Sequence, residues 1–105
     1  MQSNSGMSSI HTLATGSVSI TNTQKNSSWV PVAVLFRFEA PVTGTVTVTR
    51  TTGETVFQLA TVELAENQSA TWIPEAAYPF NLNDVLTVTS TATNGTVEII
   101  RKADQ

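Results

Sequence analysis

The sequence has no cysteine, a single histidine and few charged side chains. Charged residues make up 12% of the chain, against roughly a quarter in ordinary soluble domains. Without cysteine, disulfides and thiolate metal sites are excluded. The net charge is −3 and no basic cluster exists beyond Arg101-Lys102, so we expect neither nucleic acid nor an anionic membrane as a partner. The scarcity of charge leaves two interpretations open: faces covered by other protein, or a weakly charged surface in water.

The sequence also lacks the combinations of residues that carry catalysis. His11 lies in a stretch rich in Ser and Thr, far along the chain from any carboxylate. The many hydroxyls therefore have no positioned base to activate them as nucleophiles. No phosphate-binding glycine loop occurs, and no His, Cys or Asp spacing suits zinc or calcium. We expect no enzymatic activity, no cofactor and no metal site.

What the sequence does contain favours strands. Thr and Ser occupy 28 positions, apolar positions are often β-branched, and no stretch has a helical period. With 105 residues there is room for one domain. Turn signals recur at spacings of about 8–12 residues, as in small sandwiches. We therefore predict an all-β fold, a small antiparallel β-sandwich or jelly-roll-like domain, with strands near 31–39, 43–51, 55–64, 69–73 and 84–101.

The clearest turn signal is Asn94-Gly95. Both residues accept the positive φ angles of a type I′ turn, which predicts a hairpin over residues 83–101. Folding the chain back on this turn places Ala92 opposite Val97 and gathers the apolar residues on one face. The other face carries mostly Thr, with Ile100 as an apolar exception.

A second hairpin is expected over residues 42–64, around Gly53. Pairing Val46 with Leu59 and Val48 with Phe57 puts these four side chains on one face. Residues 32–39 are apolar on both faces, which indicates an interior strand or one covered by a partner. The predicted core is Phe36, Val46, Val48, Phe57, Leu59, Leu86, Val88, Val97 and Ile99.

The N-terminal stretch differs from the rest in composition. It is rich in Ser, Thr, Asn and Gly, and its apolar residues are too thinly spaced to offset the entropy of ordering it alone. We predict an extended N-terminal arm over residues 1–29 that ties the protein to its neighbours, followed by a β-sandwich domain over residues 30–105. The alternative is a disordered tail with an edge strand at 17–21. Side chains without an evident place in the domain core are the predicted partner interface: Ile10, Leu13, Val18, Ile20, Trp29, Tyr78 and Ile100.

Four strand-and-turn motifs add a family resemblance. They are Pro-Val-x-Gly-Thr-Val-x-Val from residue 41, Leu-Ala-Thr-Val-x-Leu from residue 59, Asn-Asp-Val-Leu-Thr-Val-Thr-Ser from residue 83 and Asn-Gly-Thr-Val-Glu-Ile from residue 94. The stretch from 41 to 101 resembles bacteriophage virion accessory proteins, most closely capsid decoration or cement proteins. The resemblance implies a non-enzymatic protein, made in the host cytoplasm and placed on the capsid exterior. It would bridge neighbouring copies of the major capsid protein and bind copies of itself in a symmetric cluster such as a trimer.

Two alternatives remain open at this point. One is a phage tail, adaptor or fibre-attachment protein. The other is a glycan-binding or receptor-binding β module, in which exposed Trp29, Trp72 or Tyr78 would provide a stacking platform.

Overall fold

The computed structural model describes residues 6–104, and within this range the chain forms eight β-strands and no helix. The predicted all-β class is therefore confirmed. The strands are β1 (Gly6–Thr12), β2 (Ser17–Thr21), β3 (Trp29–Val42), β4 (Thr45–Thr52), β5 (Thr55–Glu63), β6 (Asn67–Trp72), β7 (Val85–Ser90) and β8 (Gly95–Ala103).

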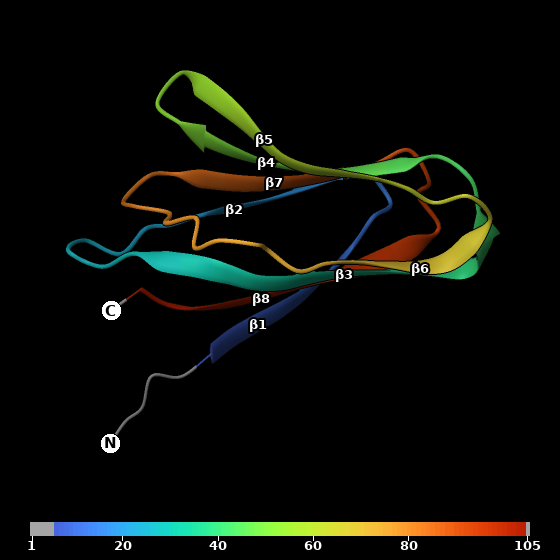
Figure 1. Ribbon diagram of the computed structural model, residues 1–105, viewed down its shortest axis with the longest axis horizontal. Helices are drawn as coiled ribbons and strands as arrows, with labels where there is room; N and C mark the ends of the chain where they lie inside the picture. Colours follow the sequence, from blue (N-terminus) through green and yellow to red (C-terminus); the bar gives the residue numbers. More distant parts are fainter. Residues whose placement is uncertain (1–5, 105) are drawn as a thin grey trace.

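The strands form two antiparallel sheets that lie face to face (Figure 1). The first sheet has the order β1-β8-β3-β6, and the second has the order β2-β7-β4-β5. Only β4 and β5 follow one another within a sheet, because every other connection crosses from one sheet to the other. This arrangement of eight strands is a jelly roll, as the sandwich prediction allowed.

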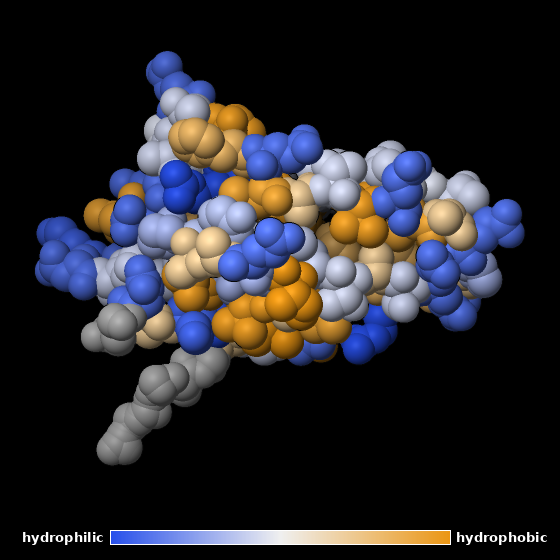
Figure 2. Space-filling view, viewed as in Figure 1, coloured by the Kyte–Doolittle hydropathy of each residue, from blue (hydrophilic) through white to orange (hydrophobic). Residues whose placement is uncertain are grey.

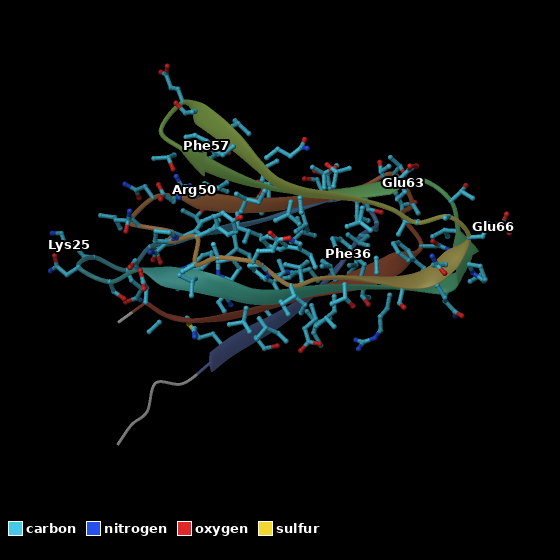
Figure 3. All side chains as sticks on the ribbon, in the orientation of Figure 1. Lys25, Phe36, Arg50, Phe57, Glu63 and Glu66 are labelled. Atoms are coloured by element: carbon cyan, nitrogen blue, oxygen red, sulfur yellow. The ribbon has the colours of Figure 1, made fainter. Side chains whose placement is uncertain are left out.

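Period-two alternation places the core between the sheets. Val46 and Val48 of β4 point inward, and the threonines between them point outward. Phe36 projects from β3 into the space between the sheets (Figure 3). Burying such a side chain contributes roughly 1.5–3 kcal/mol. The buried cluster comprises Leu13, Trp29, Val34, Phe36, Phe38, Val46, Val48, Leu64, Phe80, Leu86, Val88, Val97 and Ile99.

The predicted arm is part of the sandwich over residues 6–21. β1 pairs with β8 and β2 pairs with β7, so the two strands lie at one edge of each sheet. Leu13, between them, is 0% exposed. The predicted boundary after residue 29 is therefore wrong here, because the C-terminal strands supply the pairing and the core that this stretch lacks by itself. The edge strand of the alternative interpretation corresponds to β2, and residues 1–5 of the predicted arm lie outside the described range.

The predicted Asn94-Gly95 hairpin is also wrong. β7 and β8 belong to different sheets, and neither Asn94 nor Gly95 has the positive φ of a type I′ turn. Residues 91–94 instead cross between the sheets. The apolar residues still point to one core, because the inner faces of two opposed sheets satisfy the same alternation as one face of a hairpin.

The β4–β5 hairpin exists, but its register differs from the prediction. Val46 pairs with Val62 and Val48 with Ala60, whereas Arg50 pairs with Phe57. The shift between these pairs leaves Leu59 as the extra residue of a β-bulge. The loop has two residues and begins with Gly53 at φ +60°, the position where a type II′ turn takes glycine.

This register changes the burial of one predicted core residue. Beyond the bulge, the hairpin rises away from the sandwich (Figure 1), so no opposing sheet covers its end. Phe57 is 44% exposed there instead of buried. Leu59 is half-buried against the core, and the other seven predicted core residues are buried.

Candidate functional site

Several apolar side chains gather on the outer face of the first sheet. Ile10 of β1, Leu35 of β3 and Ile100 of β8 point outward by alternation, opposite to the inward-facing Val97 and Ile99. A register shift in β3 adds Val32, which the regular alternation would have placed inside. We call the outward-facing set Ile10, Val32, Leu35, Ile73 and Ile100 the outer patch.

The most exposed members of the outer patch are at its two sides. Ile10 is 69% exposed on edge strand β1, and Ile73 is 61% exposed just after edge strand β6. Figure 2 shows hydrophobic surface gathered at the lower middle of the view, beside the strands labelled β3 and β8 in Figure 1. The patch therefore extends across the width of the sheet.

One charged side chain lies within the outer patch, because Glu98 stands between Ile10 and Leu35 in one cross-strand row. Arg37 and Glu98 approach to 3.8 Å, and Ser8 Oγ donates a 2.8 Å hydrogen bond to the carboxylate of Glu98. The ion pair is solvent-exposed, so its net contribution to stability is about 0–1 kcal/mol. Because Glu98 has partners within the chain, covering the outer patch need not leave its charge unpaired.

The outer face of the second sheet has a different character. It presents hydroxyls in cross-strand rows, for example Ser17, Thr89, Thr47 and Thr61 along successive pairs. Ser19 Oγ and Thr87 Oγ1 share a 2.9 Å hydrogen bond within this face. The two outer faces of the sandwich thus differ, one carrying the apolar side chains of the outer patch and the other rich in hydroxyls.

A smaller apolar site lies on the projecting end of the β4–β5 hairpin. Val56 is 62% exposed, and the guanidinium carbon of Arg50 lies 5.0 Å from the ring centroid of Phe57 (Figure 3). Arg50 Nη1 also donates a 3.1 Å hydrogen bond to the carbonyl of Pro79. This contact ties the base of the projection to the loop before β7.

The structure distributes the predicted interface residues over several environments. Ile10 and Ile100 lie together on the outer patch. Leu13 and Trp29 are buried, and Val18 and Ile20 pack partly buried against the core from β2. Tyr78 is half-buried, with its ring 6.2 Å from that of Trp72.

Three members of the outer patch were missed as interface residues from the sequence. Leu35 had a usable signal, since its strand is apolar on both faces and lies inside the sheet. Val32 had none, because its outward direction depends on the register shift in β3. Ile73 follows the outward-facing Thr71 by two residues, a relation that requires the strand pairing to be known.

The described residues contain no cluster of side chains typical of a metal site. Between residues 6 and 104 no group of three His, Cys, Asp or Glu side chains converges. His11 Nε2 shares a 2.9 Å hydrogen bond with the hydroxyl of Ser9. In the same range, no helix is long and apolar enough to cross a membrane.

No family model matches the chain, and no curated protein matches it. Among solved structures, the chain is similar to the core of Drosophila NLP, whose crystal structure was described for its insight into pentamer formation and histone binding. The TM-score is 0.56, and the match covers 95% of this chain and 98% of the Drosophila chain. The sequences are 16% identical over the match, so the likeness shows the fold alone.

This finding corrects the predicted function. A solved structure that the chain resembles over nearly its whole length is the Drosophila NLP core, described for its pentamer formation and histone binding, and neither family models nor curated proteins provide a match to a phage protein. The prediction of a capsid decoration protein that bridges major capsid subunits is therefore wrong. The jelly-roll arrangement occurs in many unrelated proteins, so strand-and-turn motifs alone do not identify a virion role.

Proposed function

We propose that this protein is a non-enzymatic structural module that associates with copies of itself through the outer patch. The observation that carries the proposal is the exposure of Ile10 and Ile73 on opposite sides of one apolar sheet face. A sheet face in water usually alternates with polar residues outward, as the second sheet does. The exposed apolar side chains on the outer face of the first sheet are instead typical of a face that another protein covers.

The small number of charges supports the same conclusion. Surfaces that remain in water usually carry many Lys and Glu side chains, and interface centres are depleted in them. Only 12% of this chain is charged, and Glu98 within the outer patch is already paired with Arg37 and Ser8. A neighbouring subunit could therefore bury the patch without leaving a charge unpaired at its centre.

The likeness to the Drosophila NLP core supports self-association as the mode of binding. That core has this fold and was described in terms of pentamer formation. Self-association is also the simplest partnership for one exposed patch per chain, because closed symmetric assemblies are the commonest form of soluble oligomers. We propose a closed homo-oligomer.

Sedimentation velocity and light scattering would measure the mass of the protein in solution. The wild type should be an oligomer, and the double variant Ile10→Glu, Ile73→Glu should be a monomer, since each new carboxylate would be buried unpaired at the contact. Both positions are more than half exposed, so the isolated fold should tolerate the change.

Val56→Glu is the matched control. Val56 is 62% exposed on the other sheet, and its replacement adds one carboxylate, against two in the double variant, to an apolar site away from the outer patch. This variant should remain oligomeric. A monomeric wild type, or dissociation caused by Val56→Glu but not by the outer-patch variant, would contradict the proposal.

A second candidate function is the binding of a basic protein, favoured by the distribution of acidic side chains. Glu63 and Glu66 lie at one end of the long axis and Lys25 at the other (Figure 3). Glu39 belongs to the acidic end, where its carbonyl accepts a hydrogen bond from Gln68. Opposite charge at such a site favours encounter with a cationic partner.

Titration with core histones would test this second candidate. We expect binding that weakens as salt increases, and that is reduced by Glu63→Gln with Glu66→Gln. Replacement of Glu54, in the loop of the projecting hairpin, should leave binding unchanged and is the control. Equal loss in both variants would indicate an effect of net charge and contradict a site at the acidic end.

A further inference from the structure

A pocket of about 400 Å³ opens at one end of the sandwich, between the beginning of β1, the end of β8 and the loop from β2 to β3. Met7, Trp29 and Arg101 line it together with polar residues 21–24, 27 and 28. Its volume lies within the range of about 300–1,000 Å³ that ligand pockets occupy. Arg101 is the only charged side chain among the lining residues.

Arg101 is held on an aromatic platform. Its guanidinium carbon lies 5.3 Å from the centre of the Trp29 ring, and Trp29 stacks on Phe80 at 4.6 Å with an interplanar angle of 9°. Trp29 and Phe80 also exchange backbone hydrogen bonds of 3.2 and 2.8 Å. Both aromatic residues are buried, so the platform beneath the guanidinium is rigid.

The guanidinium of Arg101 has no acidic partner within residues 6–104. Its Nε atom is buried without a hydrogen-bond acceptor, and no carboxylate of the described chain lies within 4 Å. Burial lowers the pKa of Arg101, since desolvation disfavours its charged form. The Nε of Arg50 is also buried without an acceptor, but Arg50 Nη1 donates to the carbonyl of Pro79, and Arg37 pairs with Glu98.

The polar groups around Arg101 are of two kinds: those already hydrogen-bonded within the chain and those that can hydrogen-bond a ligand. The amide of Asn22 donates to the carbonyls of Ser27 and Phe80 at 3.0 and 2.7 Å and accepts from the backbone of Gln24. Asn22 therefore shapes the loop and does not serve a ligand. The hydroxyls of Thr21, Thr23 and Ser27 also line the pocket and can donate hydrogen bonds.

We propose that this pocket binds a carboxylate carried on an apolar group, with Arg101 as the partner of the carboxylate. The planar fork of a guanidinium matches a carboxylate with two parallel hydrogen bonds. Met7 and Trp29 provide apolar walls for the attached group. No acidic residue lines the pocket, and the adjacent carboxylate of Asp104 accepts a 3.4 Å hydrogen bond from the lining residue Ser28. The carboxylate can belong to a small molecule or to the end of a peptide chain.

Tryptophan fluorescence would test the proposal in a Trp72→Phe background, where Trp29 is the single reporter. N-acetyl-leucine and N-acetyl-leucinamide, at constant ionic strength, differ only in the carboxylate. The acid should give a saturable change in Trp29 emission and the amide none. Amide chemical shifts of the wild-type protein provide the same test without altering Trp72.

Arg101→Gln should weaken binding of the acid by at least about tenfold, which corresponds to the loss of a charge-assisted hydrogen bond. Arg101→Lys keeps the charge but not the fork, and should be intermediate. Lys102→Gln removes the neighbouring exposed charge and should leave binding unchanged.

Binding of the amide as tightly as the acid, or binding that survives Arg101→Gln, would overturn the proposal, as would tighter binding of inorganic phosphate. A short peptide with a free C-terminus, compared with its amidated form, distinguishes a peptide end from a small molecule as the source of the carboxylate. The pocket lies at the end of the sandwich, away from the outer patch. Binding should therefore persist in the Ile10→Glu, Ile73→Glu variant whether or not the protein self-associates.

Discussion

Two phenylalanines show how position in the sandwich decides the energetic role of a side chain. Phe36 is buried between the sheets, whereas Phe57 lies on the projecting end of a hairpin with Arg50 against its ring. We expect Phe36→Ala to lower the free energy of unfolding by about 3–5 kcal/mol, because it removes a buried ring and leaves a cavity. Phe57→Ala should cost less than about 1.5 kcal/mol, the loss of a partly exposed ring and one cation–π contact.

Urea unfolding monitored by circular dichroism would measure both changes. The comparison also tests the observed register of β4 and β5, since pairing Val48 with Phe57 would bury the ring. Equal losses in the two variants would contradict the structure.

At Gly95 the constraint on the residue is steric contact with the neighbouring strand and not a positive φ. A Cβ atom at this position would fall inside van der Waals contact with the carbonyl oxygen of Arg37 and with Phe38. Because the obstructing carbonyl belongs to the paired strand β3, the sheet must shift to admit a side chain. Gly95→Ala should lower the free energy of unfolding by about 1–3 kcal/mol, as overpacking does.

Thermal unfolding would reveal this loss as a lower midpoint. Thr96→Ala changes the next, exposed residue of β8 and is the control, with an expected effect within about 0.5 kcal/mol. A neutral Gly95→Ala would contradict the explanation that contact with β3 requires glycine at this position.

At the scale of elements, the N-terminal strands complete both sheets. β1 covers one edge of β8, β2 covers one edge of β7, and Leu13 between them belongs to the core. Deleting residues 2–24 should therefore abolish cooperative unfolding, because it removes two strands and a buried side chain together. A detachable arm would give the opposite result, a folded domain over residues 30–105.

Circular dichroism and amide dispersion in NMR spectra would distinguish these outcomes. A cooperative thermal transition in the truncated protein would show that β1 and β2 are dispensable. Deletion of residues 2–5 alone is the control, since it leaves β1 and its pairing complete, and this variant should melt cooperatively.

At the scale of the whole molecule, self-association should couple to stability. If the folded protein assembles through the outer patch and the unfolded chain does not, mass action makes the melting temperature rise with protein concentration. The Ile10→Glu, Ile73→Glu variant should melt at a temperature independent of concentration. Differential scanning calorimetry over a series of concentrations measures both, and a wild-type midpoint that does not move would contradict assembly of the folded state.

Two of the five members of the outer patch were predicted from the sequence. Ile10 and Ile100 were identified because they are apolar residues in polar surroundings, and both lie on the outer patch. Leu13 and Trp29 satisfied the same criterion and proved to be buried. Apolar residues in polar surroundings indicate burial against another protein surface. The sequence alone does not specify whether that surface belongs to the same chain or to a neighbour.

The sequence by itself determined the all-β class, the positions of the strands from residue 29 onward and most of the core. These depend on local alternation, turn residues and β-branched side chains, which act over a few neighbouring residues. Only the tertiary structure decided that β7 and β8 lie in opposite sheets, that β1 and β2 complete the sandwich, and that bulges turn Val32 and Leu59 away from regular alternation. The physical reason is that a strand's alternation specifies which face is apolar but not which strand it pairs with, and in a jelly roll most partners are distant along the chain.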